Sequence, residues 1–179
     1  IGADYMIAGQ ASSAPYILYF AHSLDIKNVP LPYEAHLEAL MEYTSEKSKP
    51  GIMLSVEPGV GQNHYIVTIV IGKTLVLINP VGKSAHHDIY NKLSVMQSAG
   101  LIEDIYINEP EMPFQHDPEG RLVSCGPISV ELVRQLSRCE NLAYDLMNLQ
   151  KQPSKNDRTS LRYHVIDIYP LIRPSILAK

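Results

Sequence analysis

Hydrophobic and polar positions along this chain repeat with a helical period in three places before residue 101. Helices are predicted from Ser12 or Ser13 to about Leu24, from about Pro32 into the forties, and from Ser84 to Gly100. The second of these ends at the polar stretch "SEKSKPG". The apolar faces that define the three helices comprise Ile17, Phe20, Ala21 and Leu24; Leu37, Leu40 and Met41; and Ile89, Leu93 and Met96.

Runs of β-branched and aromatic residues predict strands elsewhere. These runs are "GIMLSV" at 51–56, "HYIVTIVIGKTLVLINP" at 64–80, "IEDIYIN" at 102–108 and "LRYHVIDIYPLI" at 161–172. The second run has a break at Gly72-Lys73, which predicts a hairpin in a buried sheet. We expect "EPEMPFQHDPEGRLVS" to be a long loop and "CGPISVELVRQLSRC" to be a helix. Without repeats or linkers, this order predicts a single α+β domain over 1–179, with a central mixed or antiparallel sheet flanked by helices.

Composition and charge exclude several classes of protein. Apolar residues make up 45% and charged residues 19% of the 179 residues, as in an ordinary globular domain. The net charge of -4 argues against nucleic acid as the main partner. No apolar run approaches the roughly 18 residues of a membrane span, and no signal peptide opens the chain. Since the chain starts at Ile1 rather than Met, we expect an excised domain, and the compartment is only weakly constrained.

The two cysteines are placed where they cannot bridge each other. On one helix Cys125 and Cys139 would lie 14 residues apart, roughly 20 Å at 1.5 Å per residue. A disulfide needs Cα atoms within about 7 Å. Together with the lack of Asn-X-Ser/Thr sites, this spacing favours a reducing compartment.

Cys125 stands at the predicted start of a helix, before a Gly-Pro pair. A thiol there meets the positive end of the helix dipole and unpaired backbone N–H groups, which favour the thiolate. A buried, inert cysteine between loop and helix is the alternative, and the local sequence favours neither. A nucleophile also needs a base.

His64 and Asn79 form a candidate base and orienter. His64 begins the first strand of the predicted hairpin and Asn79 follows the end of the second, so the two residues should be neighbours. Taken singly, His64 could be a solvated strand end and Asn79 a turn residue before proline. The adjacent His86, His87 and Asp88 would point about 100° apart on a helix, so we expect a solvated face there and no metal.

The stretches "NHYIVTIVIGKTLVLINPVG" and "QHDPEGRLVSCGPISVELV" resemble the clan CE cysteine peptidases, which include proteases specific for SUMO and other ubiquitin-like proteins and bacterial effector deubiquitinases and acetyltransferases. The shared pattern is a histidine followed by an aromatic residue, a hairpin ending in Asp, Glu or Asn, and a glutamine before a Cys-Gly that opens a helix. The match covers residues 63–136, and its Ser-Cys-Gly-Pro form is most similar to the bacterial effector branch. The resemblance implies a papain-like arrangement with the catalytic cysteine at a helix N-terminus.

The resemblance also implies a role for individual residues. His64 would be the base, Asn79 the orienter, Gln115 an oxyanion-hole donor and Cys125 the nucleophile. The substrate-binding residues it implies are Tyr65, Gly61 and Gly126; Gly61, with Gly59, would let a narrow substrate tail pass close to the backbone. The chain departs from the pattern in three respects: Tyr65 replaces the usual Trp, Asn79 is neutral, and Gln115 lies ten residues before Cys125.

The function expected from the sequence is a cysteine isopeptidase that removes ubiquitin or a ubiquitin-like modifier after its C-terminal Gly-Gly. It would act as a bacterial effector in the host cytosol, as a monomer, without cofactor or metal. Two alternatives are an acetyltransferase of the same clan, with Cys125 carrying the acetyl group of acetyl-CoA, and a modifier-binding pseudoenzyme, which the neutral Asn79 would fit.

Overall fold

A computed structural model describes residues 15–21, 32–58, 63–80, 87–108, 125–149, 155–156 and 160–171 of the chain. The elements in chain order are β1 (Ile17–Ala21), α2 (Tyr33–Lys47), β2 (Gly51–Pro58), β3 (Asn63–Ile71), β4 (Thr74–Ile78), α3 (His87–Ser98), β5 (Asp104–Asn108), α4 (Cys125–Leu136), α5 (Leu142–Met147), β6 (Lys155–Asn156), β7 (Arg162–Ile166) and the 3₁₀ turn η2 (Tyr169–Leu171). Within these ranges, every helix falls short of the length and apolarity that a membrane span requires.

The described strands form one seven-stranded mixed sheet in the order β1-β2-β3-β4-β5-β7-β6. β2, β3 and β4 pair antiparallel, whereas β1 with β2, β4 with β5, and β5 with β7 pair in parallel. β6 is antiparallel to β7. Five strands therefore run in one direction and β3 and β6 run against them, so the start of β3 lies at the same edge of the sheet as the ends of β4 and β5.

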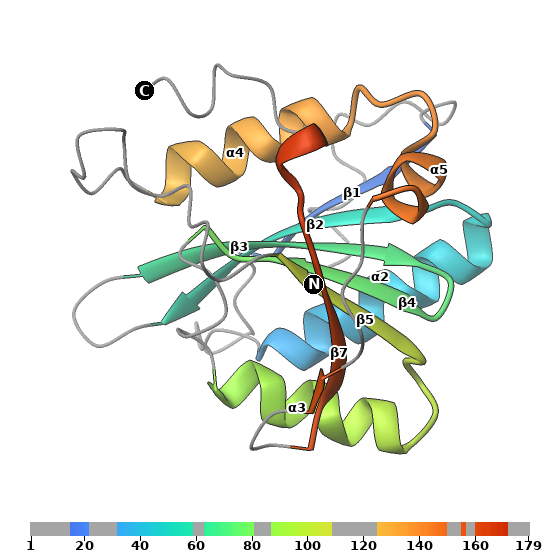
Figure 1. Cartoon of the computed structure of the whole chain (residues 1–179), viewed down its shortest axis with the longest axis vertical. Helices are drawn as coiled ribbons and strands as arrows, with labels where there is room; N and C mark the ends of the chain where they lie inside the picture. The colour runs from blue at the N-terminus through green and yellow to red at the C-terminus, as the bar shows by residue number, and fades with distance from the viewer. Residues whose placement is uncertain are drawn as a thin grey trace, which may run out of the picture.

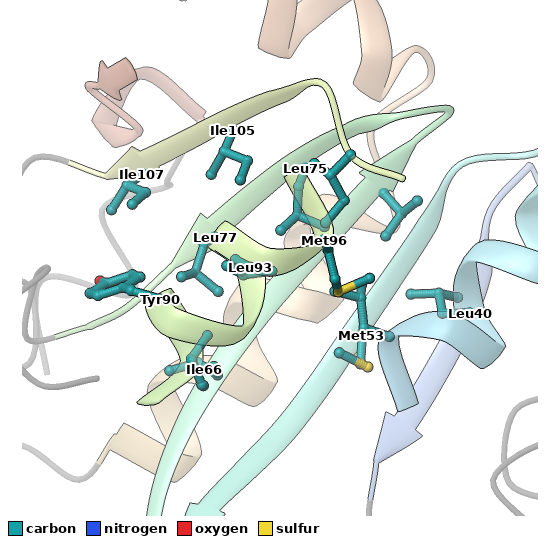
Figure 2. Packing of buried hydrophobic residues seen from close by; sticks show 14 of the residues in the cluster. Leu40, Met53, Ile66, Leu75, Leu77, Tyr90, Leu93, Met96, Ile105 and Ile107 are labelled. Carbon is teal, nitrogen blue, oxygen red and sulfur yellow. The ribbon is translucent and has the colours of Figure 1, made fainter. Parts of the chain in front are cut away.

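Helices cover both faces of the sheet (Figure 1). α2 and α3 pack on one face, where Figure 2 shows the side chains of β3, β4 and β5 meeting those of α3. α4 and α5 pack on the other face. The central strands are apolar at nearly every position because they are buried on both sides; in β3, residues 66–70 are all buried. The predicted class, an α+β fold with a mixed sheet flanked by helices, is confirmed, and so is the papain-like placement of a helix that begins at Cys125 against the sheet.

Most predicted elements are confirmed. α2 begins after Pro32 and ends where "SEKSKPG" was expected to end it, and α3 precedes Gly100, which has a φ of 75°. Their predicted inward residues are buried, except Met41, which is partly buried against the same cluster. The hairpin turn lies at Gly72-Lys73 as expected, with Gly72 at a φ of 59°, the conformation that favours glycine at the first position of a two-residue turn.

The helix predicted at the start of the chain is wrong over the part that the structure describes. Residues 17–21 form strand β1, which pairs in parallel with β2. Ile17, Tyr19 and Ala21 point into the α2 and α3 side of the core, and Phe20 is 41% exposed. Residues four apart lie on one face in a helix and also in a strand, so the positions of Ile17 and Ala21 do not distinguish the two structures. Tyr19, buried between them, fits only the strand.

Two short elements were not predicted. α5 has six residues and starts at Asn141, whose side chain accepts a hydrogen bond from the Tyr144 N–H at 3.1 Å. β6 has two residues and pairs with the start of β7. The closing strand is shorter than expected, because β7 ends at Ile166 and a 3₁₀ turn follows at Tyr169–Leu171. The loop at 109–124 lies outside the described residues.

Gly51 lies where β2 passes under α2, and we expect replacement by alanine to destabilise the fold. A Cβ atom at this position would stand 2.7 Å from both Leu40 Cδ1 and Thr44 Cγ2, whose side chains are buried. Crowding of this kind typically costs about 1–3 kcal/mol in the free energy of unfolding. Urea unfolding of Gly51→Ala measures the loss. Gly72→Asn is the matched control, because its site is open and asparagine tolerates positive φ; equal stability of both variants would contradict the crowding.

His36 makes the stability of the fold depend on pH. Its ring is buried, and its Nδ1 lies 2.8 Å from the Tyr19 hydroxyl. Burial raises the pKa of Tyr19 to about 12, so the phenol stays protonated at neutral pH.

Burial also lowers the pKa of His36 below its ordinary 6.5, so the unfolded chain takes up the proton first as the pH falls. The contribution of neutral His36 to the free energy of unfolding is therefore fully present above pH 6.5. It is lost as the pH falls through the lower pKa that His36 has in the folded protein. We expect the difference in unfolding free energy between pH 7.5 and pH 5.5, measured in urea, to be smaller in His36→Gln than in the wild type. An identical difference in both proteins would show that other groups account for it.

Candidate active site

The proposed base and its orienter belong to two neighbouring strands that meet at one edge of the sheet. The β3 to β4 register pairs Val67 with Ile78. Continued by one residue, it places Asn79 opposite Ile66, two residues along β3 from His64. On its other side, His64 pairs with Glu57 of β2. The sheet thus brings the main chain of His64 and Asn79 to diagonal positions.

Asn79 is buried, with no exposed surface, and its main chain is held by β5. The Asn79 N–H donates to Oδ1 of Asn108 at 2.8 Å, and Nδ2 of Asn108 donates to the Asn79 carbonyl, also at 2.8 Å. Asn108 is the last residue of β5 and is 1% exposed. These two bonds hold the peptide groups on both sides of the Asn79 Cα, so they fix the direction of its Cα–Cβ bond.

Helix α4 begins at Cys125 and packs against the start of β3. Figure 1 shows α4 beginning on the side of the sheet where β3 begins. The buried Ser129 hydroxyl, four residues into the helix, lies 3.5 Å from the carbonyl oxygen of Tyr65, the residue after His64. Four residues are about one helical turn, or roughly 6 Å. The first turn of α4 therefore stands next to the start of β3.

The far end of α4 is anchored at the start of β1. The Tyr16 hydroxyl donates to the Cys139 carbonyl and accepts from the Leu142 N–H at 3.0 Å. Burial raises the pKa of Tyr16, so the phenol keeps the proton that it donates. With Ser129 near one end and Tyr16 at the other, the helix is fixed across the sheet, and so is the main chain at Cys125.

The second cysteine lies away from this edge. Cys139 is half-buried after the end of α4, is not in a disulfide, and its Sγ lies 3.7 Å from the Gln135 carbonyl oxygen. A pocket lined by Arg134, Gln135, Arg138, Cys139 and Leu171 is found there, at the opposite end of α4 from Cys125. The pocket therefore does not belong to the candidate active site.

The other predicted site residues divide into three groups. The ring of Tyr65 is partly buried and packs with the cluster under α4. Gln115 and Gly61, with Gly59, lie outside the described residues. For His64, Cys125 and Gly126 the structure describes the main chain alone. The catalytic and substrate-binding roles of all seven residues stay predictions.

Comparison with known proteins gives little beyond the chain's own features. No protein-family model matches the chain, and no curated protein matches it. Among solved structures the chain is similar to a deletion variant of AvrA, solved with IP6 and CoA, at 23% identity and a TM-score of 0.39. The match covers 64% of this chain and 41% of the AvrA chain, so this chain spans less than half of AvrA. The case for a function therefore rests on the residues at the sheet edge.

Sequence reasoning missed Asn108 and Ser129, whose side chains contact the main chain at the candidate site. Asn108 was read as the end of a strand and Ser129 as part of a helix. The contact of Asn108 with Asn79 spans 29 residues, and that of Ser129 with Tyr65 spans 64. The one sequence signal for Asn108 is that two of the predicted strands, 64–80 and 102–108, end near an asparagine followed closely by a proline.

A metal centre finds no support in the part of the chain that the structure describes. No group of three or more His, Cys, Asp or Glu side chains gathers there in a way that could hold an ion.

Proposed function

We propose that this chain is a cysteine enzyme of the clan CE type that forms an acyl-enzyme on Cys125, and that residues 1–179 make up one catalytic domain. The observation that carries the proposal is the meeting at one sheet edge of the start of β3, the end of β4 and the start of α4. These are the positions of His64, Asn79 and Cys125. A base, an orienter and a helix-borne thiol are the parts that cysteine acyl transfer needs.

The first step of the proposed reaction is attack by the Cys125 thiolate on the carbonyl carbon at the C-terminus of a modifier. The S–C bond forms, and the carbonyl oxygen becomes an oxyanion. Backbone N–H groups at the start of α4, with the Gln115 amide, would stabilise that charge. The C–N bond of the isopeptide then breaks, and the His64 imidazolium gives its proton to the leaving amine.

The second step releases the modifier. Neutral His64 takes a proton from water, and the resulting hydroxide attacks the thioester carbon. The C–S bond breaks, Cys125 leaves as the thiolate, and the product is a free carboxylate. Asn79 would accept the ring N–H of His64 throughout and hold the tautomer; diagonal strand neighbours lie about 7–8 Å apart at Cα, within reach of these two side chains.

The substrate we propose is ubiquitin or a ubiquitin-like modifier, in the cytosol of a host cell. Gly59 and Gly61 precede β3 in the sequence and Gly126 follows Cys125, and in this proposal these small residues would flank the scissile bond. Side chains at these positions would narrow the passage for an extended Gly-Gly tail. Tyr65 would contribute to the same passage on the α4 side.

Acetyl transfer is the second candidate, because the similar AvrA structure was solved with CoA. In that reaction the Cys125 thiolate would take the acetyl group from acetyl-CoA and pass it to a substrate hydroxyl or amine. Both candidates share the thioester on Cys125 and differ in the acyl donor.

One experiment separates the candidates. The chain is incubated with ubiquitin and SUMO probes that carry a C-terminal electrophile, and separately with acetyl-CoA, and the mass of the intact protein is measured. A probe adduct on Cys125 supports the isopeptidase, and acetylated Cys125 supports the transferase. Tight binding of a probe without an adduct indicates a pseudoenzyme, and absence of all three results contradicts the proposal.

A further inference from the structure

We propose that Asn108 is a positioning residue for the reaction: its side-chain amide sets the direction of Asn79 and, through Asn79, the orientation of the His64 ring. The inference rests on the proposed function, since it assigns Asn108 to the same site. Asn108 itself does not contact the reacting atoms in this role.

The two hydrogen bonds between these asparagines form a closed pair. Oδ1 of Asn108 accepts from the Asn79 N–H and Nδ2 donates to the Asn79 carbonyl, each at 2.8 Å. The amide plane of one side chain thus spans both peptide groups that flank the Asn79 Cα. Both residues are almost completely buried, so water cannot replace either bond without entering the core.

The side-chain pair lies directly after the last described backbone pairing between β4 and β5. β4 and β5 pair in parallel up to Leu77 and Ile107. In the next step of a parallel ladder, the carbonyl of Asn79 would accept from the N–H of residue 110. Residue 110 is a proline, which has no N–H. The Asn108 side chain supplies a donor to the Asn79 carbonyl, as that N–H would have done, and also accepts from the Asn79 N–H.

The position of this pair of hydrogen bonds links Asn108 to the proposed reaction. Asn79 follows the last residue of β4 and precedes Pro80, so the two bonds from Asn108 hold the main chain directly after the paired part of the strand. The side chain proposed to orient His64 therefore depends on Asn108 for its direction. A purely structural asparagine would affect folding and leave the ionisation of the Cys125 and His64 pair unchanged.

The test follows alkylation of Cys125 by iodoacetamide against pH, with peptide mass spectrometry to distinguish it from Cys139. In the wild type we expect a midpoint below the ordinary thiol pKa of about 8.5, because His64 stabilises the thiolate. In Asn108→Ala the midpoint should rise by roughly half a pH unit, a threefold change in the thiolate equilibrium. The kcat for a modifier substrate should fall roughly 10-fold, with little change in KM. This decrease is smaller than the one that a misplacement of about 1 Å can cause.

Two further variants keep the test decisive. Asn108→Asp keeps the side-chain shape and the acceptor and loses the Nδ2 donor, so it replaces Asn108→Ala if that variant does not fold. Thr68→Val is the matched control, because it removes another hydrogen bond of a fully buried side chain, between Thr68 Oγ1 and the Tyr33 hydroxyl at 2.8 Å. We expect Thr68→Val to lower stability and to leave the alkylation midpoint unchanged.

The outcomes separate the two proposals. A wild-type midpoint near 8.5 would overturn the proposed function and the positioning role with it. If the wild-type midpoint is lowered and the Asn108 variants have the same midpoint, the positioning role alone would be overturned. If Asn108 acts through Asn79, adding Asn108→Asp to Asn79→Ala should shift the midpoint no further; an additive shift would also overturn it.

Discussion

Replacing Cys125 with alanine should reduce hydrolysis of a fluorogenic ubiquitin-like substrate to the background rate, whereas replacing Cys139 should change it little. In the proposed mechanism Cys125 forms the covalent bond to the acyl group. Loss of a catalytic nucleophile costs up to roughly 10⁶-fold in kcat. Initial rates of the two variants, at equal concentrations of folded protein, measure the difference.

The Cys139→Ala variant is the control for loss of a thiol. Its Sγ lies near the Gln135 carbonyl at the far end of α4, so we expect a change of about 1 kcal/mol or less in unfolding free energy. Circular dichroism and urea unfolding of both variants verify that the fold is kept. Activity retained in Cys125→Ala would contradict the proposed nucleophile.

His64→Ala should be as inactive as Cys125→Ala, because without the imidazole neither the thiolate nor the protonated leaving group forms readily. We expect Gln115→Ala to lose roughly 10²-fold, as for one oxyanion-hole donor, and Asn79→Ala to lose less. A neutral orienter holds the ring through a hydrogen bond alone, while the Cys125 thiolate supplies the negative partner for the imidazolium.

The carboxylate variant Asn79→Asp should stay active and shift the pH optimum upward. An added negative charge raises the pKa of His64, so the imidazolium persists to higher pH. Steady-state rates from pH 5 to 9 on the wild type, the alanine variants and Asn79→Asp establish the order. Wild-type rates in Asn79→Ala would reduce Asn79 to a turn residue, and Asp88 would then be tested as the orienter, since Asp104 begins β5 at the opposite end of the sheet.

The parts of the fold predicted correctly are those that local sequence determines. The hairpin of β3 and β4 follows from two β-branched runs and a glycine with positive φ, and α2 and α3 from apolar faces with clear ends. β1 was mistaken for a helix because its residues 17 and 21 satisfy both periods. The six-residue helix α5 is too short for a periodic signal and depends on its cap at Asn141.

For the site, the sequence predicts the positions at which chemistry-bearing residues stand and not the contacts that hold them. The hairpin itself places His64 and Asn79 at one edge, so their proximity is a local property. The parallel pairing of β4 with β5 joins segments separated by α3, and no local pattern predicts its register. The two hydrogen bonds between Asn108 and Asn79 depend on that register, and for this reason the sequence does not predict them.

The division of the site between neighbouring and distant segments has a consequence for how the molecule is assembled. β2, β3 and β4 pair in sequence order, whereas α4 contacts β3 from 64 residues away. Contacts between residues close in sequence form faster than distant ones, because they close smaller loops. During refolding, and during synthesis from the N-terminus, the strands that carry His64 and Asn79 would pair before α4 docks. Until that docking, Cys125 would react as an ordinary unfolded thiol, so its alkylation rate would report the last step of assembly.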